Sequence, residues 1–367
     1  MIYFLYSIIF FFICMGLIGY KKLTKGIYYW YFFGIVLFWG LSLQYAVDTE
    51  QYMYYYDYAV RPITQGLDAN LQHFEIGFNI IAALCKTVTS NFVLFQMLLL
   101  SFEIFLIFKG LKKLFDEEML PYIIPLLFFV YPSLLSAMRQ GIAIAIFIYA
   151  LPLIFEEKRP WRYFIWIAVA TLFHQSSIML VVVYLARFSN KLVSKDWLMY
   201  AILIVCDIIW AAGISISNDV GIISSILSNE SFQMGSKYSE YLYDEEVLSN
   251  YGIAKVLEVN VTVILYTIFC KKDKYYDFFR LILLIFVIVS FVFGGLFAHR
   301  ILYYLNILYY CCFIRSVIAV LSSSQSSRLV GYSLISMYMI WIYVFKKLYI
   351  EYDYVLLLFN NNYQLNN

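Results

Sequence analysis

Residues 2–19 read IYFLYSIIFFFICMGLIG and carry no charge. A helix needs roughly 20 mainly apolar residues to cross a bilayer, so this stretch is long enough for one span. Nine further stretches have the same character, some of them near the lower length limit: Ile27–Tyr45, Phe92–Phe108, Leu120–Leu135, Gly141–Phe155, Trp197–Gly213, Ile253–Cys270, Leu281–Ala298, Ile301–Leu321 and Leu329–Phe345. The sequence therefore predicts an all-α, polytopic integral membrane protein with about 10–12 transmembrane helices, some of them re-entrant.

The composition agrees with this fold class. Of the 367 residues, 63% are hydrophobic and 14% are charged. A soluble domain has about 45–50% apolar and about 25% charged residues. The net charge of +2 gives no indication of nucleic acid as a partner. The six cysteines lie in or beside apolar stretches and lack the spacing of a metal site or a disulfide framework, so we expect no metal and no cofactor.

Basic residues orient the chain, because cytoplasmic loops are enriched in lysine and arginine. Five basic clusters are predicted to be inside, namely those at 21–25, 109–113, 158–162, 191–195 and 271–274. Two acidic, tyrosine-rich loops are then outside, at 46–73 and 217–251. We expect one transmembrane domain over 1–346, whose first helix is retained because no basic segment precedes it, and a C-terminal tail over 347–367.

Two segments conflict with a simple count of crossings. Residues 74–90 and 163–186 must each return to the side where they began, unless the basic-residue rule fails and the 191–195 loop is outside. The roughly 24 residues of 163–186 are too few for two crossings at about 1.5 Å per residue. Irregular backbone at membrane depth is tolerated where protein or a watery cavity surrounds it. We therefore expect these two segments to be re-entrant or interfacial and to line a cavity.

Two motifs place ionisable residues near membrane depth, where such residues often mark function. The first is Met138-Arg139-Gln140-Gly141-Ile142-Ala143, at the outer end of a helix with small residues at 137, 141 and 145. The second is Phe173-His174-Gln175-Ser176-Ser177, which interrupts the apolar segment 163–186. The alternatives are an arginine that reaches the lipid headgroups and a histidine that only completes a packed core.

Two further places collect charge on the predicted outer side. One is His299-Arg300, followed by Tyr303-Tyr304, after a pair of glycines. The other is the loop with Asp48, Glu50, Asp57 and several tyrosines, followed by Glu75 at the start of an apolar segment. Aromatic rings stack on sugars, and carboxylates accept hydrogen bonds from hydroxyl groups. An interfacial belt and a solvated loop are the alternative readings.

Together these residues favour one kind of chemistry. Arginine binds phosphate groups through two parallel hydrogen bonds and stays charged, so Arg139 and Arg300 suit a lipid diphosphate. His174 or a carboxylate could take the proton of an acceptor hydroxyl while the arginines stabilise the leaving diphosphate. Glu103, Asp207, Glu258 and Arg315 also lie in apolar stretches, and we expect them to pair across helices for structure.

The motifs resemble the EpsG family, which is similar to Wzy-type oligosaccharide repeat-unit polymerases, between about Asp48 and Tyr310. The specific part is Arg139-Gln140-Gly141-Ile142-Ala143 followed about 35 residues later by Phe173-His174-Gln175-Ser176. Five residues carry over as the expected catalytic set: His174, Arg139, Arg300, Glu75 and Asp48. Six are expected to bind substrate: Gln140, Gln175, Tyr52, Tyr55, His299 and Tyr304.

The resemblance implies a membrane glycosyltransferase of GT-C-like architecture in the bacterial plasma (inner) membrane. It would join repeat units carried on undecaprenyl diphosphate into an O-antigen, a capsule or an exopolysaccharide, next to a flippase and chain-length regulator proteins in the same lipid bilayer. Three alternatives use similar residues: an O-antigen-ligase-like enzyme, a polysaccharide flippase or transporter, and a membrane O-acyltransferase. A transporter would be expected to show internal repeats, which the sequence lacks.

Overall fold

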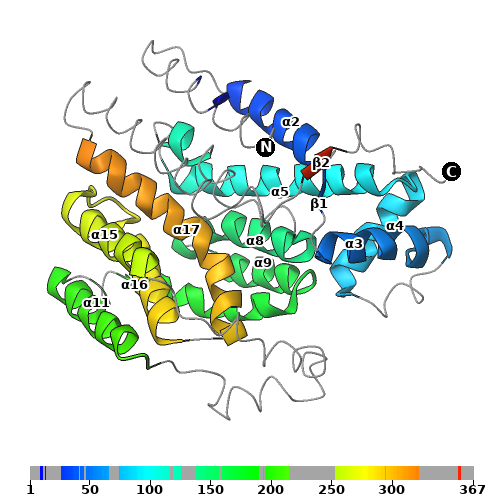
Figure 1. The fold of residues 1–367 in the computed structure, drawn as a ribbon. Coiled ribbons are helices and arrows are strands. Elements are labelled where there is room, and N and C mark those ends of the chain that lie inside the picture. The colour runs from blue at the N-terminus through cyan, green and yellow to red at the C-terminus, as the bar shows by residue number, and fades with distance from the viewer. Residues whose placement is uncertain are drawn as a thin grey trace. The chain divides into compact units, whose positions relative to one another are not determined.

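The computed structural model describes residues 9–10, 13, 26–40, 42–44, 47–65, 74–115, 119–124, 137–156, 159–189, 193, 195–214, 253–293, 295–321 and 354–356. Helices make up nearly all of these ranges (Figure 1). The chain divides into two compact units, one of Met1–Tyr184 with Tyr332–Asn367 and one of Leu185–Gly331. The site described below lies in the first unit.

The first unit contains long and short helices and one small strand pair. Its elements are α2 (Gly26–Gly40), β1 (Ser42–Gln44), α3 (Val47–Tyr54), η1 (Tyr55–Ala59), η2 (Ile63–Gln65), α4 (Ile76–Val88), α5 (Phe92–Leu114), α8 (Met138–Ala150), η3 (Leu151–Phe155), α9 (Trp161–Thr171) and β2 (Tyr354–Leu356). Helix η4 (Gln175–Phe188) begins in this unit and ends in the other. Strands β1 and β2 pair antiparallel, with Leu43 opposite Val355.

Helix α5 has one buried face and one face suited to lipid. Large apolar side chains recur at spacings of three and four residues and are 41–52% exposed, namely Leu94, Leu98, Phe102 and Phe105. This spacing places them on one side of the helix. The opposite side packs on α8 and α2. Asn91 caps the helix, because its Oδ1 accepts hydrogen bonds from the N–H groups of Val93 and Leu94.

Helix α8 is the most enclosed helix of this unit, since it packs against both α5 and α9 (Figure 1). Of the predicted small-residue face, Gly141 and Ala145 are buried on this helix. The approach to α5 is close at Gly110, where a β-carbon would collide with the backbone of Ile148. Arg139 is the second residue of α8, so this packing fixes the backbone from which it projects.

The two segments predicted to be re-entrant or interfacial form short helices. Helix α4 has 13 residues, which is about 20 Å of helix and less than the roughly 30 Å hydrocarbon core. Helix α9 has 11 residues and ends at Thr171, and η4 starts at Gln175. The interruption predicted around His174 is therefore confirmed, although the structure does not test on which side of a membrane it lies.

The second unit contains α11 (Asp196–Ala211), α15 (Ile253–Phe269), α16 (Tyr276–Val292) and α17 (Gly295–Leu321). Helix α16 packs on α11 and α17, and α15 packs on α17. The predicted boundary at Ala298 was wrong. Helix α16 ends at Val292 and α17 begins at Gly295, so His299 and Arg300 lie inside α17. The apolar run continues through both helices, and hydropathy alone therefore does not locate the break.

Three helices among the described residues are long and apolar enough to cross a membrane: Phe92–Leu114, Met138–Phe155 and Ile301–Val320. These spans and the helical fold identify an all-α membrane protein. The predicted spans at 2–19, 120–135 and 329–345 fall wholly or mostly outside the described residues, as does the outer loop at 217–251. The total number of spans and the single transmembrane domain stay predictions.

Candidate functional site

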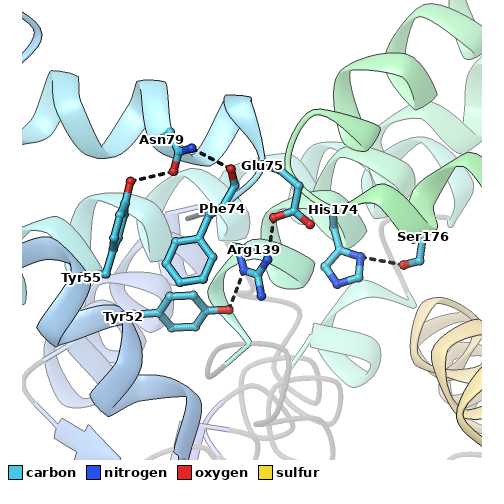
Figure 2. A network of polar contacts seen from close by, with 8 residues as sticks. All are labelled: Tyr52, Tyr55, Phe74, Glu75, Asn79, Arg139, His174 and Ser176. Atoms are coloured by element: carbon cyan, nitrogen blue, oxygen red, sulfur yellow. Dashed lines mark hydrogen bonds and ion pairs between the residues drawn. The ribbon is translucent and has the colours of Figure 1, made fainter. Parts of the chain in front are cut away.

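Arg139 is held by a tyrosine and a glutamate that come from two other segments of the first unit. Its Nε donates a hydrogen bond to the Tyr52 hydroxyl at 3.1 Å, and its Nη1 pairs with Glu75 Oε2 at 2.6 Å (Figure 2). The guanidinium lies over the Phe74 ring, 4.4 Å from the centroid. An arginine aligned by a carboxylate and an aromatic face has a fixed orientation, which anion recognition requires.

The guanidinium keeps an open side. The Arg139 side chain is 27% exposed, whereas that of Glu75 is 13% exposed. Nε and Nη1 make the two contacts above, and no described residue accepts a hydrogen bond from Nη2. An arginine has five N–H donors, so most of them remain available to a phosphate oxygen at the exposed edge.

A second contact brings Glu75 and His174 to the same place. The N–H of Gly77 donates to the Leu172 carbonyl oxygen at 2.8 Å. Gly77 follows Glu75 by two residues, and Leu172 precedes His174 by two, so their backbones meet beside both side chains. Figure 2 shows the imidazole of His174 directed toward the Glu75–Arg139 pair. The two motifs singled out in the sequence therefore share one site with Glu75.

His174 is oriented by its own loop. Its Nδ1 lies 2.6 Å from Ser176 Oγ, and both residues are 5% exposed. The turn is closed because the N–H of Ser177 donates to the His174 carbonyl oxygen at 3.0 Å. With Nδ1 engaged by Ser176, a proton transfer to the imidazole would use Nε2.

A layer behind the site fixes Phe74 and Glu75. The hydroxyl of Tyr55 donates to Asn79 Oδ1 at 2.6 Å, and Asn79 Nδ2 donates to the Phe74 carbonyl oxygen at 2.7 Å (Figure 2). Burial raises the pKa of Tyr55 to about 12, so its hydroxyl keeps the proton that it donates at physiological pH. Asn79 is fully buried. Its two bonds join η1 and Phe74 to the first turn of α4.

Tyr52 and Tyr55 were expected to bind substrate, and both are only 5% exposed. The structure places the first on Arg139 and the second on Asn79. Gln140 is 4% exposed on α8, and Gln175 is half-buried at the start of η4. A role for any of these side chains in substrate binding stays a prediction.

The remaining expected site residues lie on two other helices, α3 and α17. Asp48 lies in the first turn of α3. His299, Arg300 and Tyr304 belong to α17 in the second unit, where Tyr304 is 1% exposed. A meeting of Arg300 with Arg139 stays a prediction. Among the described residues, no group of three His, Cys, Asp or Glu side chains could hold a metal ion.

Three of the four ionisable residues assigned to structure pair with neighbours inside the second unit. Asn260 Nδ2 donates to Asp207 Oδ2 at 2.8 Å. Glu258 Oε1 accepts from both Lys255 Nζ and Tyr309 OH at 2.9 Å. Arg315 pairs with Asp273 in the turn before α16. Glu103, on α5 of the first unit, is 2% exposed. None of these contacts involves the Arg139 site.

Sequence reasoning missed Phe74, Gly77 and Asn79 as parts of the site. One signal was present. Asn79 is the only amide of α4 and is followed by the apolar run Ile80–Cys85, and it lies four residues after the N-cap Glu75, so the two are on one side of the helix start. A buried amide needs hydrogen-bonding partners, which makes such a residue a candidate for holding a neighbouring loop.

Comparison of the sequence with known protein families identifies the family of this chain. A sequence model of the EpsG family matches residues 27–360, which is most of the chain. The chain belongs to the EpsG family. It is therefore a membrane protein of polysaccharide biosynthesis, in a family whose known kind is the Wzy-like polymerase. No curated protein and no solved structure matches the chain. The EpsG match contains every residue of the site around Arg139.

Proposed function

We propose that this EpsG-family protein is a Wzy-type polymerase of oligosaccharide repeat units. It spans the bacterial plasma membrane several times and acts at the outer face. Its substrates are repeat units on undecaprenyl diphosphate, and its product is a surface polysaccharide. A flippase that delivers the repeat units and a protein that regulates chain length would be its partners in the same membrane.

The observation that carries the proposal is Arg139, fixed by Glu75 and Tyr52 with part of its guanidinium exposed. A diphosphate presents several oxygens with negative charge, and a fixed arginine fork recognises such groups through parallel hydrogen bonds. The donors left on Arg139 are those at its open side. Charge that builds up on the departing diphosphate would be stabilised at this edge.

The transfer forms one glycosidic bond and breaks one bond to the diphosphate. The hydroxyl oxygen at the non-reducing end of the acceptor repeat attacks the anomeric carbon of the donor glycan. The bond from that carbon to the diphosphate oxygen breaks, and undecaprenyl diphosphate leaves with the bonding electrons. The hydroxyl proton passes to His174 Nε2, or to the Glu75 carboxylate in a second variant of the step. Ser176 at Nδ1 stabilises the orientation that this transfer needs.

We propose Arg300 as a second residue that binds the diphosphate and Asp48 as a further acidic residue of the site. Both assignments come from the match to the family motif. Arg300 can be tested by itself, because a second arginine is expected to stabilise the same leaving diphosphate as Arg139. Arg300→Lys should then reduce the rate in the same manner as Arg139→Lys. If Arg139→Lys lost activity and Arg300→Lys did not, Arg300 would serve the packing of α17 or the membrane interface and not the reaction.

The direct experiment uses purified protein in vesicles with lipid-linked repeat units. A ladder of products that differ by whole repeats is expected from the polymerase. Transfer of a single glycan to another lipid or protein would instead identify the ligase-like alternative. Transport of the lipid-linked unit without new bonds would identify a flippase.

Arg139→Lys tests the site itself. The variant keeps the positive charge and loses the fork, so it should insert normally and lose most polymer formation. His174→Ala should abolish chain extension. Near-normal polymer from Arg139→Lys would refute the diphosphate role, and unchanged polymer length from His174→Ala would leave the imidazole a packing residue.

A further inference from the structure

Tyr54, at the end of α3, and Tyr58, in η1, lie on the other side of the α3–η1 segment from Tyr52. Tyr54 is 67% exposed and Tyr58 is 75% exposed. Their ring centroids are 4.9 Å apart, with an angle of 42° between the planes. Large aromatic rings are usually buried, and two adjacent exposed rings make a surface that is suited to a flat partner.

A π-helical turn begins between the two exposed rings. The N–H of Val60 donates to the Tyr55 carbonyl oxygen at 2.9 Å, which is the i to i+5 bond of η1. Consecutive Tyr55 and Tyr56 are buried, while Tyr54 and Tyr58 face outward. Turns of this kind are rare and are found frequently at functional sites.

The segment that carries Tyr54 and Tyr58 is held in place by its buried neighbour Tyr56. The Tyr56 hydroxyl donates to the Thr89 carbonyl oxygen at 2.7 Å, and the Tyr56 ring stacks on Phe95 with centroids 4.4 Å apart. Lys86 Nζ donates to the Tyr56 carbonyl oxygen at 2.8 Å. A surface that is ordered before binding loses little conformational entropy when a ligand arrives.

The chemistry of the face favours a glycan over lipid chains. Its exposed side chains besides the tyrosines include Gln51, Asp57 and Arg61, all with hydrogen-bonding groups. Tyr54 and Tyr58 are the only exposed large hydrophobic residues among residues 51–65 of the described chain. Helix α5 shows the contrasting case, with a stripe of exposed leucine and phenylalanine side chains. Sugar rings need both an aromatic face and polar groups at the rim.

The face lies on the same short helical segment as Tyr52, on the opposite side from the Arg139 contact. Tyr54 and Tyr58 follow Tyr52 by two and six residues, which is about 3 and 9 Å of rise along the helix. We propose that Tyr54 and Tyr58 form a glycan-binding platform that holds the oligosaccharide of the lipid-linked substrate while its diphosphate end lies at Arg139. This inference rests on the proposed function and names the part of the site that recognises sugar.

The test measures binding of the lipid-free repeat-unit oligosaccharide to the full-length protein in nanodiscs, together with polymer length in cells. Tyr54→Ala with Tyr58→Ala should weaken binding roughly tenfold, the effect of about 1.4 kcal/mol, and shorten the polymer. The double Phe variant keeps both rings and should bind within about threefold of the wild type. Tyr29→Ala is the matched control, because Tyr29 is also 67% exposed but lies on α2.

The outcomes separate this proposal from the polymerase proposal. Equal binding by the wild type and the double Ala variant would overturn the platform, even if polymer forms. An equal loss from Tyr29→Ala, or a loss of insertion into vesicles by the double Ala variant, would show an interfacial role and also overturn it. Tyrosine-dependent oligosaccharide binding by a protein that makes no polymer would support the platform and refute the polymerase.

Discussion

The backbone N–H of Gly77 donates to the carbonyl oxygen of Leu172 at 2.8 Å, and this bond joins the start of α4 to the end of α9. The two helices are separated by more than 70 residues of sequence, yet the contact brings the Glu75 and His174 positions together. A β-carbon on Gly77 would lie 2.8 Å from that carbonyl oxygen. Only glycine allows the two backbones to approach so closely.

Gly77→Ala should therefore damage the site more than the fold. The added methyl group meets backbone, which cannot move aside as a flexible side chain can, and overpacking costs about 1–3 kcal/mol. The resulting shift separates Glu75 from His174, and misplacement of about 1 Å can reduce a rate roughly a hundredfold. The rate of polymer formation per folded molecule should fall at least tenfold, measured with the vesicle assay beside thermal unfolding.

Gly110→Ala is the control for that change. Gly110 also faces backbone, at Ile148, but in the packing of α5 on α8 away from the site. It should lower the Tm without a matching fall in the rate per folded molecule. If Gly77→Ala reduced the Tm and left that rate unchanged, the contact would serve the fold alone.

Tyr52→Phe should cost more activity than Tyr55→Phe. The first change removes the acceptor for Arg139 Nε, and a hydrogen bond to a charged group contributes about 1.5–3 kcal/mol. The value of kcat/KM should fall roughly 10- to 100-fold. The second change breaks the bond to buried Asn79, so it should mainly lower the Tm. Equal effects of the two variants on kcat/KM would contradict a special role for Tyr52.

The sequence identified Arg139, His174 and Glu75 as members of one expected catalytic set, each as an ionisable residue in or beside an apolar stretch. It did not pair Arg139 with Glu75, because the two residues are 64 positions apart and only tertiary packing brings them together. Sequence spacing reports neighbours on one helix, and this ion pair joins two segments.

The tyrosines between residues 52 and 58 show the same limit. A run of aromatic residues suggested substrate binding, and composition alone did not separate the buried rings at 52, 55 and 56 from the exposed ones at 54 and 58. The buried and the exposed rings each follow helical spacing, but the acidic, polar composition predicted a loop here and not the helices α3 and η1. The helical fold and the interruption at His174 were predictable, because apolar runs and a polar break are direct consequences of the membrane environment.

Ser176→Ala tests how His174 is oriented. The variant removes the oxygen 2.6 Å from Nδ1, so the imidazole loses the partner that fixes its tautomer. A hydrogen bond of this kind contributes about 1 kcal/mol, so kcat should fall roughly fivefold with KM unchanged. The limb of the pH–rate profile that reports the base should also shift. Thr171→Ala is the control, since its hydroxyl bonds only to Ile167 of the same helix. An unchanged pH profile in Ser176→Ala would show that Ser176 does not position the base.

The second unit offers a stability prediction at Arg280, which is 1% exposed. Its Nη2 pairs with Asp196 Oδ1 at 2.9 Å, while its Nη1 lies 3.8 Å from Asp277 Oδ1. Asp196→Asn leaves a buried cation without its nearer carboxylate, a change that costs about 3–5 kcal/mol when both partners are buried. The Asp196 side chain is 46% exposed, and solvent screening reduces the expected loss to about 1–3 kcal/mol. Asp277→Asn, at the longer distance, should cost less than about 1 kcal/mol. Thermal unfolding of the purified variants measures both, and a Tm loss from Asp277→Asn that equals or exceeds that from Asp196→Asn would contradict the assignment of Asp196 as the main partner.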